Sequence, residues 1–180
     1  MIRFDPEKHR RRSIRLSGYD YSRAGVYAVT ICTHNRECLF GEIVDGRMVL
    51  NDFGRILSDE WNRINLVHER INLDAMVVMP NHFHGIIVLT NPMGAIRELP
   101  LPGNPIQRRR MTIPKLVGRF KMITAKRINQ LHKSPGMRIW QRNYYERIVR
   151  NERELNRIRE YIHHNPARWD QDAENPDMIP

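Results

Sequence analysis

Residues 73–90, with the sequence LDAMVVMPNHFHGIIVLT, decide the fold, because they combine two apolar stretches with a sharp interruption. Residues 73–79 and 83–90 are rich in aliphatic and β-branched side chains, which favours buried strands. Pro80 and Asn81 break the apolar pattern between these two stretches. We therefore predict two consecutive strands here.

The segments on either side of this stretch do not alternate regularly between strand and helix patterns. In chain order, the other predicted elements are a buried strand at 26–33, a hairpin at 39–44 and 47–50, a helix at 51–65, a loop at 91–110, a long helix at 112–132, a short strand at 144–149 and a last helix at 152–165. This order predicts an α+β fold, with an antiparallel sheet covered on one face by two or three helices.

Local signals support the ends of these elements. Asp45 and Gly46 favour a hairpin turn because both residue types accept a positive φ. Asn51 can cap the helix that follows it, and Pro166 stops the last helix because a residue before proline is pushed out of the α region. In the long helix, we expect Leu131 to share the buried face with the apolar residues before it.

Length and composition predict a single domain over 1–180, with a basic N-terminal arm at 1–20 and a polar tail at 171–180 that we expect to be frayed. The chain has 180 residues, 41% of them hydrophobic, which is enough for a core. Its apolar runs fall short of the ~20 residues of a membrane helix, so no membrane partner is expected. Cys32 and Cys38 cannot form a disulfide framework, and the charged N-terminus is unlike a secretory signal. We therefore expect the cytoplasm.

The net charge of +10 is distributed unevenly along the chain. Residues 99–145 contain no acidic residue, whereas they contain eleven Lys and Arg. A second basic cluster lies within residues 8–15, and acidic residues gather at 146–160 and in the tail. This segregation favours a groove that binds a polyanion, although a solvated helix edge remains an alternative for the basic side chains of the long helix.

His82 and His84 stand at positions i and i+2 of the second predicted strand, so their side chains should point to the same face. Two neutral imidazoles at this spacing can hold a divalent ion if a third ligand comes from elsewhere. A His-x-His pair also arises by coincidence on surfaces and in cores. His163 and His164 do not offer a matching pair, because adjacent helical residues lie about 100° apart.

Tyr161 and Asn165 lie four residues apart on the last predicted helix, one above the other on one flank of its apolar stripe. A phenol one turn from a carboxamide can place a nucleophile beside a metal ligand. The alternative is that Tyr161 packs at the helix edge and Asn165 is an ordinary C-terminal cap before Pro166. The spacing alone does not choose between these interpretations.

Taken together, several motifs resemble those of the REP-associated tyrosine transposases, which are relatives of the IS200-like transposases in the HUH endonuclease superfamily. The motifs that carry the resemblance are RRSIRLSGYDYS, ICTHNRECLFGEI, LDAMVVMPNHFHGIIVL, IWQRNYYERIVRNE and YIHHNPARW. The resemblance implies the HUH endonuclease fold, which is a ferredoxin-like antiparallel sheet covered by helices. Its central strand would carry His82 and His84.

The same resemblance implies roles for individual residues. His82, His84 and Asn165 would hold Mg²⁺ or Mn²⁺, and Tyr161 would be the nucleophile. The implied activity is that of a site-specific, metal-dependent endonuclease and strand transferase, which acts on single-stranded DNA at hairpin-forming repeats through a 5′-phosphotyrosine. Tyr144 and Tyr145 are the alternative nucleophiles, and they are also candidates for stacking on unpaired bases or for core packing.

In this interpretation the basic residues form the DNA-binding surface. The residues expected to contact DNA are Arg10, Arg11, Arg12, Arg108, Arg109, Arg110, Lys115, Arg119, Lys126 and Arg142. The resemblance slightly favours a monomer over a homodimer, and it suggests association with the nucleoid. The alternative function is that of a non-catalytic protein that binds hairpin DNA or RNA with a decayed transposase site.

Overall fold

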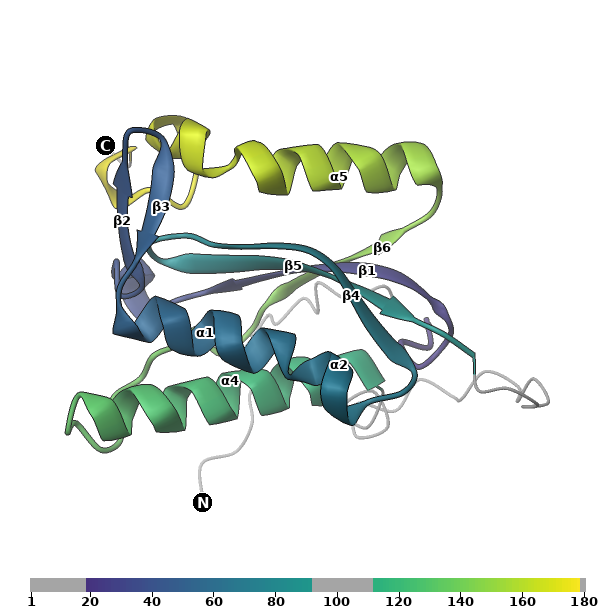
Figure 1. The fold of residues 1–180 in the computed structure, drawn as a ribbon, viewed down its shortest axis with the longest axis horizontal. Coiled ribbons are helices and arrows are strands. Elements are labelled where there is room, and N and C mark those ends of the chain that lie inside the picture. The colour runs from purple at the N-terminus through teal and green to yellow at the C-terminus, as the bar shows by residue number, and fades with distance from the viewer. Residues whose placement is uncertain (1–18, 92–111, 179–180) are drawn as a thin grey trace, which may run out of the picture.

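The computed structural model describes residues 19–91 and 112–178, and its centre is an antiparallel sheet (Figure 1). The strands, in the order in which they lie side by side, are β4 (Ile71–Val78), β5 (His82–Leu89), β1 (Gly25–Cys32) and β6 (Tyr145–Val149). Helix α1 (Asp52–Asn62) connects β1 to β4, and α4 (Thr112–Leu131) connects β5 to β6. This βαββαβ order is that of a ferredoxin-like fold, so the predicted α+β class is confirmed.

The predicted hairpin is inserted between β1 and α1, as strands β2 (Gly41–Val44) and β3 (Arg47–Leu50). Its turn is formed by Asp45 and Gly46, with φ of 50° and 70°. The Oδ1 atom of Asn51 then accepts hydrogen bonds from two main-chain N–H groups in the first turn of α1, as a capping residue does. The helix ends earlier than predicted, and a short helix α2 (Ile64–Val67) follows it.

Helices α1 and α4 cover one face of the sheet and enclose the main core. Phe83 of β5 packs there with its ring centroid 4.6 Å from that of Trp61 and 5.3 Å from that of Phe120. The prediction for Leu131 is wrong, because its side chain is 53% exposed. This residue lies in the last turn of α4, and that end of the helix extends past α1 (Figure 1).

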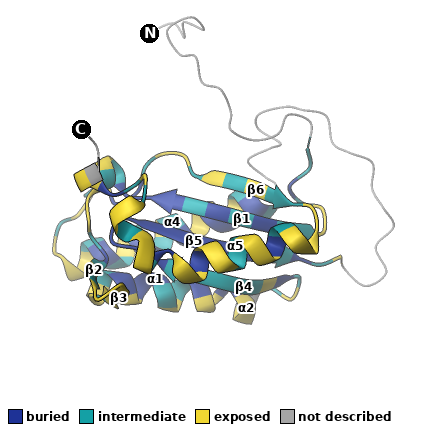
Figure 2. Cartoon of the chain, turned by 90° about the horizontal axis from the view of Figure 1, so that it is seen from above, coloured by how far each residue is buried: buried dark blue, intermediate teal, exposed yellow. Residues whose placement is uncertain are grey.

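Helix α5 (Glu152–His164) covers the opposite face of the sheet (Figure 1). The prediction that helices cover one face is therefore wrong. The reason lies in β5, where alternate side chains are apolar on both faces: Ile86 packs beneath α5 with Leu155 and Ile162, whereas Phe83 faces α1 and α4. Because the strand is buried on both sides, a single layer of helices would leave half of its apolar surface in water. Figure 2 shows the resulting contrast, with buried β1 and β5 beneath an α5 whose outer side is exposed.

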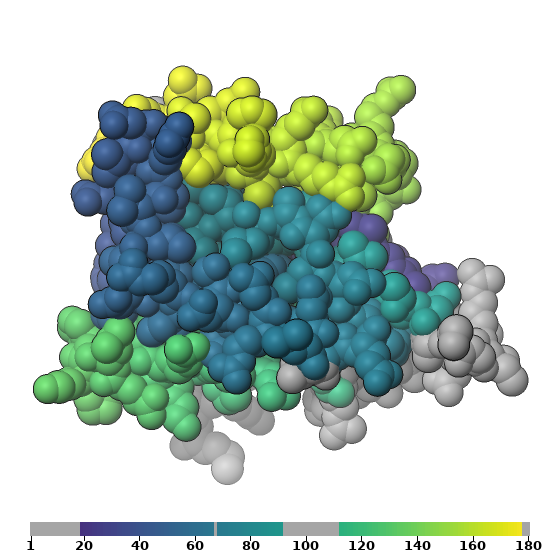
Figure 3. All heavy atoms as spheres, in the orientation of Figure 1, coloured from purple at the N-terminus to yellow at the C-terminus, as the bar shows by residue number. Residues whose placement is uncertain are grey.

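The C-terminal segment is ordered rather than frayed, contrary to the prediction for residues 171–180, as far as residue 178. It forms two short 3-10 helices, Pro166–Gln171 and Pro176–Met178. Asn175 is buried, and its Nδ2 donates a hydrogen bond to the carbonyl oxygen of Trp169. The hairpin β2–β3 stands beside this segment (Figure 3), where Gly46 approaches Ala167. Hydrogen bonds and ion pairs of residues such as Glu174 and Asn175 therefore hold this segment in place, although Gln171 and Asp177 are exposed.

A further 3-10 turn, His34–Arg36, follows β1. Among the described residues, no helix has both the length and the apolar character needed to cross a membrane. The predicted N-terminal arm and loop lie outside the described residues, apart from residues 19, 20 and 91.

Candidate active site

The candidate site starts from one row of residues across the sheet. His84 of β5 is paired in register with Thr30 of β1, which is paired on its other side with Tyr145 of β6. Residues in register share a face of the sheet, so these three side chains point to the side that α5 covers. His82 lies two residues before His84 and therefore faces the same side, as predicted.

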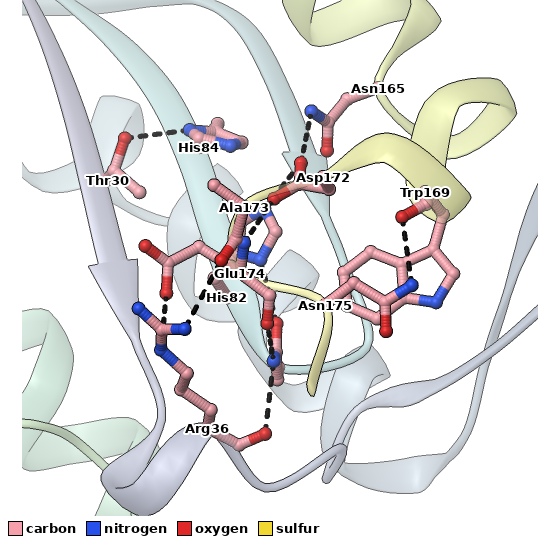
Figure 4. A network of polar contacts seen from close by, with 11 residues as sticks. Thr30, Arg36, His82, His84, Asn165, Trp169, Asp172, Ala173, Glu174 and Asn175 are labelled. Carbon is pink, nitrogen blue, oxygen red and sulfur yellow. Dashed lines mark hydrogen bonds and ion pairs between the residues drawn. The ribbon is translucent and has the colours of Figure 1, made fainter. Parts of the chain in front are cut away.

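The two histidines lie close together, with ring centroids 4.6 Å apart. The Nδ1 atom of His82 is 2.8 Å from the Oδ1 atom of Asn81, and Nδ1 of His84 is 2.8 Å from the hydroxyl of Thr30 (Figure 4). Asn81 uses its Nδ2 to donate to the carbonyl oxygens of Arg36 and Glu174, so its Oδ1 accepts the Nδ1–H of His82. This contact leaves Nε2 of His82 with a free lone pair.

Both imidazoles are neutral near pH 7 because they are buried. Burial lowers the pKa of His82 to about 4, although the Asp172 carboxylate and the Asn165 side chain oppose this effect. Burial also lowers the pKa of His84 to about 3, and its proximity to His82 adds to the shift. Neither Nε2 atom has a hydrogen-bond partner, and both are inaccessible to solvent. A neutral imidazole with an unpaired nitrogen is ready to bind a metal ion.

Helix α5 brings Tyr161 and Asn165 to the histidines. The Tyr161 ring lies edge-on to His84 with centroids 5.2 Å apart, and its side chain is 45% exposed. Partial burial raises the pKa of Tyr161, and the charge of Asp172 adds to this, so the phenol carries its proton at neutral pH. Asn165 is buried, and its Oδ1 also lacks a hydrogen-bond partner.

Three buried atoms in this site therefore lack partners: Nε2 of His82, Nε2 of His84 and Oδ1 of Asn165. Orphaned polar atoms of this kind are costly in a folded protein, and a bound cation would satisfy all three. Within the described residues, no group of three or more His, Cys, Asp or Glu side chains can hold a metal ion. The set here is of a different kind, because its third donor is an amide oxygen. Its two imidazoles and one amide oxygen fit a divalent cation such as Mn²⁺.

Two hollows meet at this site. One has a volume of about 460 Å³ and is bordered by the C-terminal segment, including Arg168 and Asp172. The other has a volume of about 530 Å³ and extends along β1, β6 and α5, past Arg157. The residues common to both are Thr30, His84, Tyr145 and Tyr161. The Tyr161 side chain thus stands where a molecule lying across both hollows would pass.

The sequence did not reveal that the C-terminal segment completes the site. Trp169 stacks near His82 with ring centroids 6.0 Å apart, and Asp172 accepts a hydrogen bond from Asn165 (Figure 4). Arg36 holds the segment in place through an ion pair with Glu174 at 3.2 Å. No periodic pattern marks these residues, because the segment consists of two short 3-10 helices and an irregular connection between them. Arg157 was also missed, although its position one turn before Tyr161 was a usable signal.

The basic residues predicted to bind DNA do not all lie near Tyr161. Lys115, Arg119 and Lys126 are exposed on α4, which lies across the sheet from α5 (Figure 1). Arg142 is also exposed. The N–H of the preceding residue, Gln141, donates a hydrogen bond to the carbonyl oxygen of Cys32, which is paired with His82 in the sheet. Contact of these residues with DNA stays a prediction. The remaining six, Arg10, Arg11, Arg12, Arg108, Arg109 and Arg110, lie outside the described residues.

The alternative tyrosines and histidines occupy different environments. Tyr145 is 55% exposed and borders both hollows, so it is available to a ligand. Tyr144 packs against the main core, and its hydroxyl donates a hydrogen bond to Glu146. His163 and His164 are exposed on α5 and contact each other.

Known proteins are similar to this chain over part or most of its length. Residues 106–165 match the family described as "Transposase IS200 like", a span that contains Tyr161 and Asn165. An uncharacterized protein of Haemophilus influenzae is 40% identical over 168 residues, which cover 91% of this chain and 92% of that protein.

Two solved structures are also similar to this chain. One is a REP-associated tyrosine transposase bound to a REP hairpin, with 20% identity and a TM-score of 0.48, covering 86% of this chain and 71% of the other. The second is a transposase candidate from Deinococcus radiodurans R1, with 22% identity and a TM-score of 0.44, covering 83% of this chain and 96% of the other.

Proposed function

We propose that this chain, of which residues 106–165 match the IS200-like transposase family, is a metal-dependent endonuclease and strand transferase for single-stranded, hairpin-forming DNA. One observation carries the proposal. His84 borders both hollows together with the half-exposed Tyr161, and Asn165 borders one of them. His82 lies against His84, and each of the three ligand candidates carries an unpartnered buried atom. A phosphodiester in this position would face both a cation and a nucleophile.

The residues have complementary roles in the proposed reaction. His82, His84 and Asn165 would hold Mg²⁺ or Mn²⁺, which when bound supplies Lewis-acid stabilisation of the charge that develops on a non-bridging phosphate oxygen. Thr30 and Asn81 hold the two imidazole rings in their orientations through Nδ1. Such contacts to the second ring nitrogen are usual for metal-binding histidines.

Tyr161 would act as the nucleophile. Its Oη attacks the phosphorus atom, a bond forms between Oη and phosphorus, and the bond between phosphorus and the 3′ oxygen breaks. The phenolic proton leaves to solvent, which reaches the half-exposed side chain, and the departing 3′ oxygen takes up a proton from solvent. The products are a 5′-phosphotyrosine and a free 3′-OH, and one phosphorus–oxygen bond has replaced another.

Rejoining needs no external energy source, because the phosphotyrosine keeps the energy of the phosphodiester. The oxygen of a second 3′-OH attacks the phosphorus atom and loses its proton to solvent, while the bond to Tyr161 breaks and the phenolic oxygen takes up a proton from solvent. Tyr145 is exposed beside the same hollows and offers a ring on which an unpaired base can stack. This feature favours single-stranded DNA near the scissile phosphate. We further propose that the protein is a monomer and acts in the cytoplasm.

The test uses a labelled single-stranded hairpin DNA with the full chain and Mg²⁺ or Mn²⁺. We expect an adduct between protein and DNA that resists denaturation, together with a shorter DNA fragment that carries a 3′-OH. The Tyr161→Phe variant should form no adduct, whereas Tyr145→Phe should retain it. Since Tyr161 is half exposed, its loss should leave the unfolding temperature almost unchanged.

The result also separates this proposal from non-catalytic binding of a hairpin. Binding without any adduct, on palindromic DNA taken from beside the gene, would contradict the enzymatic function. An adduct that persists in Tyr161→Phe would show that the wrong nucleophile had been chosen.

A further inference from the structure

Asp172 is a buried carboxylate that contacts the candidate metal site without belonging to the predicted ligand set. Its side chain is 7% exposed, although it lies in the polar C-terminal segment. Its Oδ2 accepts a hydrogen bond of 3.0 Å from Nδ2 of Asn165, and its Oδ1 accepts one of 2.8 Å from the N–H of Glu174. Its Oδ2 also lies 4.0 Å from Nε2 of His82.

The contact with Asn165 determines which end of the amide faces the histidines. A carboxylate only accepts hydrogen bonds, so it can pair with the NH₂ end of Asn165 and not with the oxygen. With Nδ2 bound to Asp172, the unpartnered Oδ1 is the end left for a cation. Without a charged acceptor at this position, either end of the amide could point into the site, and an NH₂ group cannot bind a metal ion.

Contacts of the two residues that follow Asp172 hold it in place. The next two residues are attached to the 3-10 turn after β1, because Arg36 pairs with the Glu174 carboxylate and donates to the carbonyl oxygen of Ala173 (Figure 4). Asn81, which orients His82, donates a 2.6 Å hydrogen bond to the Glu174 carbonyl oxygen. The same group of contacts therefore fixes His82 and Asp172 together.

We propose that Asp172 is a positioning residue of the metal site, which holds Asn165 with its oxygen toward the histidines. The inference rests on the proposed metal-binding function, and it assigns a role in that function to the C-terminal segment. Partners that orient metal ligands typically change metal affinity by about 10- to 100-fold when they are lost.

The first test is Asp172→Asn, measured by titration of the full chain with Mn²⁺ in a calorimeter. If the new side chain keeps its oxygen on the N–H of Glu174, its NH₂ group faces the NH₂ group of Asn165. Two donors cannot pair, so the Asn165 amide turns and its oxygen leaves the site. We expect Mn²⁺ to bind about 10- to 100-fold more weakly.

A double variant separates positioning from a general structural role. Asn165→Asp combined with Asp172→Asn exchanges the carboxylate and the amide, which restores the hydrogen bond and presents an oxygen to the cation. We expect the double variant to bind Mn²⁺ more tightly than Asp172→Asn alone, and within about tenfold of the unaltered protein. Asp170→Asn is the matched control, since Asp170 is exposed in the same segment. The Mn²⁺ affinity of this variant should equal that of the unaltered protein.

The outcomes are distinct for the two proposals. Mn²⁺ binding by Asp172→Asn that equals that of the unaltered protein would overturn the inference and leave the metal site intact. A double variant that binds no better than Asp172→Asn would also overturn it, provided that thermal unfolding shows both variants folded. If the unaltered protein does not bind Mn²⁺, the proposed metal site fails, and the inference fails with it.

Discussion

The two faces of the sheet differ in how they are built. The face covered by α1 and α4 is apolar and closely packed, with Trp61, Phe83 and Phe120 in mutual contact. Among the described residues, the face covered by α5 has a smaller apolar cluster around Ile86, and it also carries the buried polar atoms of the candidate site.

This difference shows how one strand can serve stability and chemistry at once. Consecutive residues of β5 point to opposite faces, so Phe83 enters the core while His82 and His84 enter the site. The apolar face stabilises the fold, and this stability offsets the cost of leaving polar atoms unpartnered on the other face. Substitutions on the two faces should therefore have different consequences.

The largest effect is expected from His84→Ala, on the α5 face. His84 would hold the cation that stabilises the charge developing on the phosphate, so its loss should lower the rate of hairpin cleavage by roughly two to three orders of magnitude. Hairpin binding should change little, because His84 is buried and offers no phosphate contact of its own. Cleavage assays and binding titrations would measure the two effects. Equal losses of binding and cleavage would contradict the division between the faces.

The neighbouring substitution Phe83→Ala tests the opposite face. The lost ring leaves a cavity between Trp61 and Phe120, which should lower the free energy of unfolding by about 3–5 kcal/mol. Chemical denaturation would measure this change. The fraction that remains folded should still form the DNA adduct, and a folded but inactive Phe83→Ala would mean that the two faces are not separable.

A smaller effect is expected from Gly85→Ala, which adds one methyl group to the α1–α4 face. A Cβ atom at this position would overlap the Trp61 indole and lie 2.8 Å from Phe83, so we expect a loss of about 1–3 kcal/mol in the free energy of unfolding. The control is Gly118→Ala, where no atom lies within 4 Å of the added Cβ. That exposed helical position should instead gain about 0.5–1 kcal/mol. Similar effects at both positions would show that Trp61 is loosely packed.

The smallest effect is expected from Asp74→Asn, which removes an ion pair that attaches α5 to β4. Both oxygens of Asp74 accept hydrogen bonds from Arg159, at 2.9 and 2.6 Å. These bonds, with the Arg159 charge, hold the pKa of Asp74 below its ordinary value of 3.8, although burial opposes them. We expect a slightly lower unfolding temperature at neutral pH.

The stability difference between Asp74→Asn and the unaltered protein should depend on pH in one direction. Since the folded protein lowers the pKa of Asp74, the stabilisation is complete above the ordinary pKa and disappears as the pH falls through the lowered one. The difference between Asp74→Asn and the unaltered protein should therefore shrink below about pH 4. Asp52→Asn, which breaks an exposed pair with Arg55, is the control and should have less effect. A constant difference down to pH 2 would contradict the assignment.

Much of the fold was predictable because its signals are local. The strand and helix ends follow from apolar periodicity and from residues such as Asn51 and Pro166, whose effects act within a few positions. The period of a strand places His82 and His84 on one face, and the period of a helix places Tyr161 above Asn165. The apolar run at residues 85–89 was also a signal that β5 is buried on both faces, although the prediction assigned the helices to one face.

The tail was not predictable, because its residues are ordered by contacts with distant parts of the chain. Asp172 and Glu174 belong to a polar segment with no periodic pattern, and such composition is typical of a frayed terminus. What orders this segment is a set of partners about 90 to 140 residues away in sequence, such as Arg36 and Asn81. No short window of sequence contains both sides of these contacts.

The sequence by itself determined which side chains share a face, because that depends on backbone periodicity within one element. Only the tertiary structure decided which faces meet: α5 crosses the sheet opposite α4, so Tyr161 reaches His84 while Lys115 and Arg119 lie on the far side. Which faces meet depends on burying both faces of one sheet at the same time, and this is a property of the whole chain. The same packing brings Asp172 to Asn165 and adds a carboxylate to the site.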